Sequence, residues 1–185
     1  PMNLFYEELP MSVMVHGKAV RIRTDFRDYI RLLDMLKDKN VKPMDKLLIL
    51  REYFLDDIEI TQFSIDALCD FMSADFSDGE ASQTGTGRQK NLFSFSIDYP
   101  YILSAFLRDY GIDLIDIKYL HWWKFRMLFD GLSEDNEIKK RIMYRGMNLN
   151  EIKDPEERKR IRKIQKVIEL KQEELTDFDI GDAFA

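Results

Sequence analysis

The sequence predicts a mainly α-helical fold: a small N-terminal β-hairpin followed by a helical bundle, with a long C-terminal helix. Apolar residues recur at helical spacing through most of the chain, whereas residues 13–23 alternate as a half-buried strand pair does. The chain of 185 residues is 45% hydrophobic, enough for a core. It is also 34% charged, which is common in helical and partner-binding proteins.

The N-terminal part, residues 2–76, is predicted to contain the hairpin and three helices. Apolar residues alternate on both sides of His16-Gly17, so this dipeptide is expected to form the hairpin turn. His16 is therefore interpreted as a turn residue, since no partner for a ligand site lies near it. The residues that can begin the three helices are Thr24 or Asp25, Pro43, and Thr61 or Ser64.

Apolar spacing also gives these helices an expected inner face. In the first helix, Phe26, Ile30 and Leu33 share one side, and Asn40 marks the expected stop. In the third helix, Cys69 is expected to be a small core residue. No cationic neighbour or base stands close to it in sequence to activate the thiol.

Residues 77–91 are predicted to be a flexible linker or an exposed loop. This stretch, SDGEASQTGTGRQKN, has three glycines and no large apolar side chain, so it cannot bury enough surface to offset the entropy of ordering. Its Gly85-Thr86-Gly87 lacks the Lys-Ser/Thr ending and the preceding strand of a P-loop. Phosphate binding is therefore not expected here.

Residues 92–170 are predicted to form a helical C-terminal region. Asp98 is expected to cap its first helix, with Pro100 in the first turn and Gly111 at the end. Asp154-Pro155 predicts the start of the last helix, because the cap, the proline and the acids that follow all suit a helix N-terminus.

The stretch LHWWKFRMLF (120–129) carries both tryptophans and is apolar around most of a helical circumference. Such a helix is usually packed on several sides, so Trp122 and Trp123 are predicted to anchor a core, with Trp123 the more central. Neighbouring side chains point about 100° apart, so one of the two can face a partner instead. His121 is predicted to be a core or boundary residue, because the sequence supplies neither the orienting acid nor the nucleophile that a general base needs.

Charges are separated in the C-terminal third. Between residues 139 and 166, eleven Lys/Arg face four Asp/Glu, whereas residues 172–185 hold five acids and no base. The basic face of the last helix consists of Arg158, Lys159, Arg160, Arg162, Lys163 and Lys166. Three interpretations stay open: a solvated face beside a disordered acidic tail (171–185), contact between chains or masking of the basic face, and nucleic-acid binding. The net charge of −6 argues against the last.

Catalytic and metal-binding patterns are missing from the sequence. Two histidines and one cysteine are too few for a zinc site, and the chain lacks Walker A, dinucleotide-binding, nucleophile-elbow and kinase motifs. We therefore predict a protein that is not an enzyme and that uses no cofactor or metal. Its apolar runs are shorter than the roughly 18–20 residues of a membrane span, and its first residues do not resemble a secretory signal.

Four stretches of the chain are distinctive: Asp98 with YILSAFLRDYGIDL (101–114), YLHWWKFRMLFDGLSED (119–135), Tyr144-Arg145-Gly146-Met147, and the basic helix that ends at Leu170. Together they resemble the bacteriophage gene product 15 family of Gram-positive siphophages and prophages. The resemblance implies a tail-morphogenesis protein, whose gene usually lies between those for the tail tube and the tape measure. Tail assembly chaperones occupy that position; they coat the apolar helices of the tape measure protein and help recruit tube subunits. The family brings no catalytic residues, and the implied location is the cytoplasm of the bacterial host during phage assembly.

The first hypothesis is therefore a tail assembly chaperone that buries apolar target helices in a groove. Its expected partners are the tape measure and tail tube proteins, and a homo-oligomer stays open. The residues expected to contact a partner are Trp122, Phe129, Ile161, Ile164 and Ile168. The alternative is a nucleic-acid-binding or regulatory adaptor that uses the basic helix 155–170. An enzyme of another type would require a pocket that gathers His121 with a carboxylate and a hydroxyl.

Overall fold

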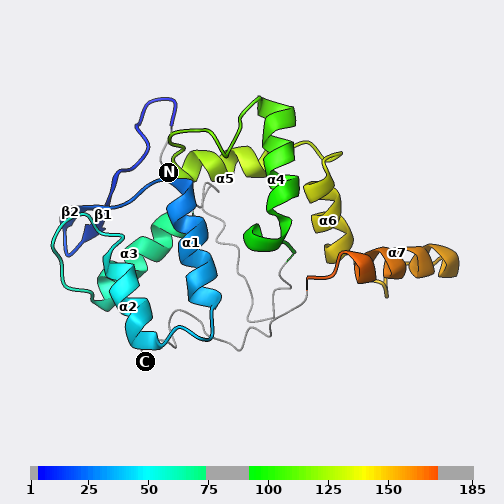
Figure 1. Ribbon diagram of the computed structural model, residues 1–185, viewed down its shortest axis with the longest axis horizontal. Coiled ribbons are helices and arrows are strands. Elements are labelled where there is room, and N and C mark those ends of the chain that lie inside the picture. Colours follow the sequence, from blue (N-terminus) through cyan, green and yellow to red (C-terminus); the bar gives the residue numbers. More distant parts are fainter. Residues whose placement is uncertain (1–3, 74–91, 171–185) are drawn as a thin grey trace. The chain divides into compact units, whose positions relative to one another are not determined.

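The computed structural model describes residues 4–73 and 92–170 (Figure 1). Within them lie a two-stranded antiparallel sheet and seven helices, which confirms the predicted mainly α fold with an N-terminal hairpin. The elements are β1 (Ser12–Val15), β2 (Lys18–Arg21), α1 (Phe26–Lys37), α2 (Pro43–Arg51), α3 (Gln62–Ser73), α4 (Phe95–Tyr110), α5 (Trp122–Asp130), α6 (Glu137–Gly146) and α7 (Pro155–Val167). The predicted linker 77–91 and acidic tail 171–185 lie outside the described residues.

The described residues form two compact units. Unit 1 contains residues 4–73 and 118–127, and unit 2 contains residues 92–117 and 128–170. The sequence assigned all of 92–170 to one region, so that boundary differs from the structure for the ten residues that carry the tryptophans. Among the described residues, none of the helices combines the length and apolar character that a membrane span requires.

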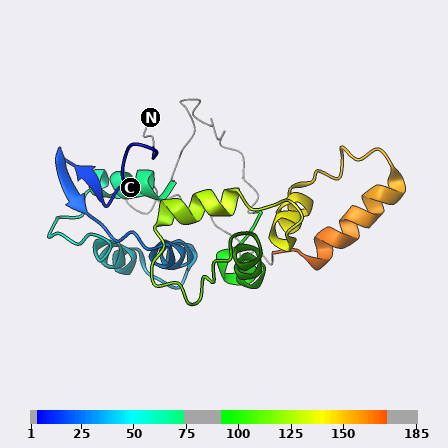
Figure 2. The same ribbon diagram turned by 90° about the horizontal axis from the view of Figure 1, so that it is seen from above.

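The hairpin of unit 1 forms as the alternating pattern predicts. β1 and β2 pair up to Val15 and Lys18, and both turn residues are left-handed, His16 with φ 48° and Gly17 with φ 76°. Two consecutive positive φ angles define the type I′ turn, whose twist matches that of paired strands. The chain after α2 extends the pairing, since the Leu55 amide donates to the Arg21 carbonyl (2.9 Å). In Figure 2, α3 lies beside β1, and α1 lies beside α2.

Helix α1 begins where the cap predicts but buries a different face. The Asp25 carboxylate accepts from the Arg27 amide (3.0 Å), which satisfies one free donor of the first turn. The buried residues are Phe26, Tyr29 and Leu32, whereas the expected Ile30 and Leu33 are only half-buried. The buried face is rotated toward Tyr29, whose ring stacks on Trp122 and whose hydroxyl donates to the Arg23 carbonyl (2.6 Å).

An aromatic cluster (Phe26, Tyr29, Phe71, Trp122, Phe125) fills the core of unit 1. The Trp122 ring stacks on Tyr29 and on Phe125, with centroids 5.4 and 5.8 Å apart, and Phe125 stacks on Phe26 at 4.8 Å. The Trp122 indole N–H donates to the Met72 carbonyl (2.9 Å), so burial leaves its polar atom paired. The second tryptophan is only half-buried, so the sequence-based ranking that made Trp123 the more central was wrong.

Residues 118–127 join unit 1 through backbone pairing as well as side chains. The Phe26 amide donates to the Leu120 carbonyl (2.9 Å), and the Trp122 amide donates to the Thr24 carbonyl (2.7 Å). Asp25 and His121 form a β-bridge between these two bonds. The segment after α4 therefore acts as a backbone partner for the start of α1, a pairing with no short-range sequence signal.

Unit 2 is organised around a buried ion pair between α4 and α6. The Arg145 guanidinium donates to both oxygens of the Asp98 carboxylate (2.7 and 3.0 Å), with side chains 5% and 0% exposed. Arg145 also donates to the backbone carbonyls of Ile168 (2.7 Å) and Leu92 (3.0 Å). The Asp98 carboxylate accepts from the Ser94 amide (3.0 Å) as well. One guanidinium thus links four segments of unit 2.

The ion pair corrects the predicted start of α4. This helix begins at Phe95 after an N-cap at Ser94, so Asp98 lies inside the helix and Pro100 lies beyond the first turn. The predicted end is confirmed: Gly111 is left-handed (φ 64°), and its amide donates to the Leu107 carbonyl (3.0 Å). Helix α7 also begins as predicted, with the Asp154 side chain accepting from the Glu156 amide (3.0 Å).

Candidate functional site

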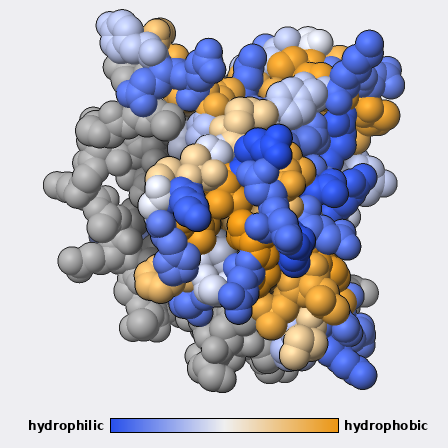
Figure 3. Space-filling model, turned by 90° about the vertical axis from the view of Figure 1, so that its left-hand side faces the viewer, coloured by the Kyte–Doolittle hydropathy of each residue, from blue (hydrophilic) through white to orange (hydrophobic). Residues whose placement is uncertain are grey.

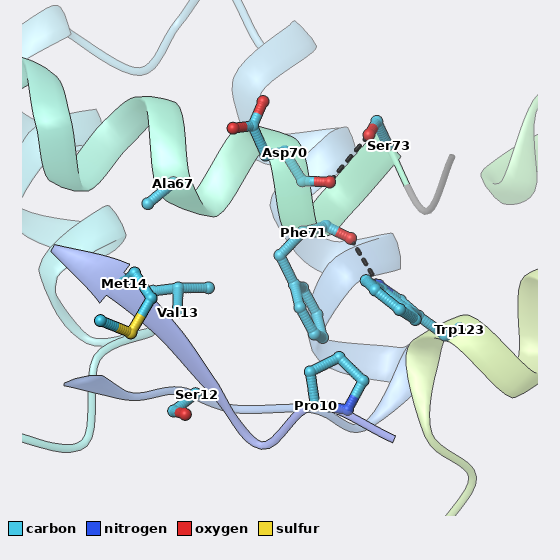
Figure 4. Close-up of a pocket in the computed structure, with 9 residues that line it drawn as sticks. All are labelled: Pro10, Ser12, Val13, Met14, Ala67, Asp70, Phe71, Ser73 and Trp123. Atoms are coloured by element: carbon cyan, nitrogen blue, oxygen red, sulfur yellow. Dashed lines mark hydrogen bonds between the residues drawn. The ribbon is translucent and has the colours of Figure 1, made fainter. Parts of the chain in front are cut away.

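A groove in unit 1 is the best candidate for binding (Figure 4). It is open, holds about 520 Å³, and lies between β1 and α3, with one side chain from α5. Its lining residues are Pro10, Ser12, Val13 and Met14 from the hairpin side, Ala67, Asp70, Phe71 and Ser73 from α3, and Trp123 from α5. Six of the nine lining residues are apolar, and polar groups supply nearly half of the exposed lining. A pocket that combines apolar side chains with polar groups is a candidate binding site.

Trp123 forms one wall of this groove. Its ring stacks on Phe71 with centroids 5.5 Å apart, and its indole N–H donates to the Phe71 carbonyl (2.8 Å), as the dashed line in Figure 4 shows. The ring is therefore held in one orientation while part of it stays exposed. The two neighbouring indoles thus divide their roles: Trp122 lies in the core and Trp123 lines a surface.

Helix α3 contributes one acid, Asp70, to the lining of the groove. Helix α3 carries Asp66 and Asp70 at i,i+4 spacing, both exposed, and has no basic residue. Between them, Cys69 is half-buried, and burial followed by these two carboxylates raises the pKa of its thiol. The thiol is therefore held protonated at neutral pH, which agrees with the prediction of an unactivated cysteine. The predicted core position was wrong, because Cys69 is only half-buried. Among the described residues, no group of three or more His, Cys, Asp or Glu could hold a metal ion.

Unit 1 also exposes apolar side chains outside the groove. Apolar surface, interrupted by hydrophilic residues, is visible in Figure 3, which faces the end of unit 1 that carries the hairpin and α2. The large apolar residues that are more than half exposed on the hairpin, α2, α3 and the segment between them are Met14, Met44, Leu48, Leu55 and Phe63. Met14 is the one of these that lines the groove.

The His121 ring forms hydrogen bonds with the backbone of two residues that line the groove, Pro10 and Trp123. Its Nε2 lies 2.9 Å from the Pro10 carbonyl oxygen, and its Nδ1 accepts from the Trp123 amide (3.1 Å). Because a carbonyl can only accept and an amide N–H can only donate, these contacts require a neutral ring with the proton on Nε2. Burial, partly offset by the hydrogen bond to Pro10, lowers the pKa of His121. The ring is a buried structural residue, as the sequence predicted.

The lowered pKa of His121 predicts that acid weakens unit 1. The unfolded chain binds a proton at His121 near pH 6.5, whereas the folded chain binds it only at lower pH. The contribution of His121 to the free energy of unfolding should therefore be constant above about pH 7 and fall as the pH drops through about 6.5. Urea unfolding between pH 5.5 and 7.5 measures this, and His121→Gln should lose the dependence. Exposed His16, replaced by Gln, is the control; an unchanged pH profile in His121→Gln would contradict the assignment.

The residues expected to contact a partner are mostly internal. The exposed fractions are 0% for Trp122, 4% for Phe129, 2% for Ile161 and 8% for Ile168, and Ile164 is half-buried. In this structure the first four are core residues and offer no surface to a partner. The groove residues Met14, Ala67 and Phe71 were missed, because only the folded chain brings β1 and α3 together. Partner binding itself stays a prediction.

The predicted basic face of α7 divides into paired and exposed side chains. Arg158 donates to the Ile152 carbonyl (3.0 Å from Nε), and Arg160 pairs with Glu157 (2.9 Å). Lys159, Arg162, Lys163 and Lys166 are exposed. On the opposite side, Ile161 and Ile168 are buried, and Gln165 donates to the Tyr144 carbonyl (2.8 Å).

Comparison with known proteins gives one informative result. A family model described as "Bacteriophage Gp15 protein" matches residues 5–170, which include both units. No curated protein and no solved structure matches the chain. The distinctive residues Asp98 and Arg145 are the two members of the buried ion pair, and Trp122 lies in the aromatic cluster.

Proposed function

The chain belongs to the bacteriophage Gp15 protein family, and we therefore propose that it is a non-enzymatic protein of phage tail morphogenesis. Its action would be that of a tail assembly chaperone in the host cytoplasm, binding apolar helices of the tape measure protein and helping to recruit tail tube subunits. The family match over residues 5–170 is the observation that carries this proposal.

The groove of unit 1 supports the chaperone function. A target helix would place a few apolar side chains between β1 and α3, against Met14, Phe71 and Trp123, in the helix-in-groove mode. The held ring of Trp123 loses little freedom on binding, which favours affinity. The carboxylates of Asp66 and Asp70 would select helices with nearby Lys or Arg and disfavour acidic ones. The groove, rather than the buried apolar residues of α5 and α7, is the proposed contact surface.

Co-expression with a tape measure fragment tests the proposal. The wild-type chain should raise the soluble fraction of the fragment well above the level given by an unrelated acidic protein. Met14→Lys, which places a charge in the groove, should lose most of this effect. The matched control is Met44→Lys on α2, since Met14 and Met44 are 62% and 67% exposed and receive the same new charge.

The results for the wild-type chain test the chaperone function, and the results for the two variants test whether the groove is the contact surface. If the wild-type chain works no better than the unrelated protein, the chaperone function is wrong. If both variants work as well as wild type, the groove is not the contact surface. Circular dichroism of both variants checks that each remains folded.

The exposed basic side chains of α7 favour a second candidate, a nucleic-acid-binding or regulatory adaptor. Salt dependence distinguishes the two functions. Binding to phosphates releases counterions and weakens steeply as salt is added, whereas capture of an apolar helix persists.

A further inference from the structure

Four basic side chains of α7 form one continuous line on its surface, which we name the basic stripe: Lys159, Arg162, Lys163 and Lys166. Their spacing of three, four and seven residues places them on one side of the helix. That side lies opposite buried Ile161, so the stripe faces away from the core of unit 2. Val167, which follows Lys166 and lies one helical turn after Lys163, is 84% exposed and gives an apolar contact beside the end of the stripe.

The stripe is charged without a counter-charge. Within residues 4–73 and 92–170, no carboxylate lies within salt-bridge distance of its four members, although their neighbour Arg160 pairs with Glu157. Like charges at i,i+3 and i,i+4 repel one another and destabilise a helix. An acidic occupant would relieve this repulsion, so the stripe is suited to an acidic segment.

We propose that the acidic segment 173–182 of the same chain binds the basic stripe. The segment carries five acids and no base, which complements the four positive charges of the stripe. Its acids are Glu173, Glu174, Asp177, Asp179 and Asp182. Phe178 and Ile180, which lie between the acids, can contact exposed Val167. The interaction covers the basic surface and withholds it from other acidic molecules.

Chain length allows this contact within one molecule. The stripe spans seven residue steps of α7, about 10 Å at a helical rise of roughly 1.5 Å per residue. An extended chain covers about 3.3 Å per residue, so the residues after Val167 can turn back and run along the whole stripe. A tether this short gives an effective concentration on the order of millimolar, which lets a weak electrostatic contact form.

Amide NMR relaxation of the full chain tests the proposal. The wild-type chain should show raised heteronuclear NOE values over residues 173–182, and these should fall in the stripe variant Lys159→Gln/Arg162→Gln/Lys163→Gln/Lys166→Gln. The matched control removes the same number of exposed positive charges elsewhere: Lys39→Gln/Lys42→Gln/Lys140→Gln/Lys153→Gln. Its NOE values should equal those of wild type. Salt near 1 M, where the screening length is about 3 Å, should act on wild type as the stripe variant does.

The reciprocal change makes the test independent of the folding of the stripe variant. Neutralising the five acids as Gln or Asn should shift the amide signals of residues 159–167 and leave those of α4 in place. Equal NOE values in wild type and stripe variant would overturn the proposal. So would NOE values that rise with protein concentration, which would assign the contact to a second copy. A stripe that responds to short duplex DNA at physiological salt, but not to neutralised acids, would identify nucleic acid as the occupant instead.

Discussion

Replacing Trp122 by alanine is expected to destabilise unit 1 by about 3–5 kcal/mol, the usual cost of removing a fully buried large aromatic side chain. The ring is 0% exposed and stacks on Tyr29 and Phe125. Its loss also leaves the Met72 carbonyl without its indole donor. A typical domain is stable by about 5–15 kcal/mol, so the variant keeps only part of its stability. Hydrogen exchange of the α1 and α3 amides measures the change.

The neighbouring residue provides the control for this prediction. Trp123→Ala removes the same side chain from a half-buried position at the groove wall, so it should cost clearly less than Trp122→Ala. Exchange rates are preferable to tryptophan fluorescence because both variants remove a fluorophore. Equal losses, or a larger loss for Trp123→Ala, would contradict the placement of Trp122 at the centre.

Replacing Arg145 by methionine is expected to destabilise unit 2 by about 3–5 kcal/mol, because the Asp98 carboxylate is then buried without a counter-charge. The change also removes the donors that the Ile168 and Leu92 carbonyls use. The residues next to Leu92, before α4, and next to Ile168, after α7, should therefore lose their order first. Hydrogen exchange of the α4 and α6 amides, compared with that of α1, reports the effect on unit 2.

Two further variants separate charge from geometry at this pair. Arg145→Lys keeps the charge but cannot donate to both carboxylate oxygens and two carbonyls at once, so it should recover only part of the stability. In Asp98→Asn/Arg145→Met the buried charges are both removed, and the loss should be smaller than for Arg145→Met. If the double variant is as unstable as the sum of its single variants, the two side chains do not act as a pair.

Features set by neighbouring residues could be predicted from the sequence. The turn at His16-Gly17, the caps Asp25 and Asp154, and the end of α4 at Gly111 all follow from backbone preferences of a few adjacent residues. The core position of the double tryptophan stretch could also be predicted, because its apolar circumference leaves no wet face large enough for an exposed helix.

Features set by distant residues could not be predicted. Asp98 is a residue type that often caps helices, and nothing near it in the sequence indicates its partner. Its role in a buried ion pair depends on Arg145, which lies on α6, 47 residues further along the chain. Trp122 and Trp123 have the same chemistry, so their order of burial depends on where Phe71 and Met72 lie at the end of α3. The groove is likewise missed, because it needs β1, α3 and Trp123 in one place.

Unit 1 is built from two separate stretches of the chain, and this affects how it folds during synthesis on the ribosome. The segment that completes this unit, residues 118–127, is synthesised after α4, which belongs to the other unit. Until that segment emerges, Tyr29 lacks the Trp122 ring and Phe71 lacks the Trp123 ring on which each stacks, and the start of α1 lacks its backbone partner. The core of nascent unit 1 therefore stays incomplete while residues 92–117 of unit 2 are being made. A gene fragment that ends at the predicted linker, near residue 77, would encode unit 1 without residues 118–127 and therefore without the Trp122 side chain at the centre of its core.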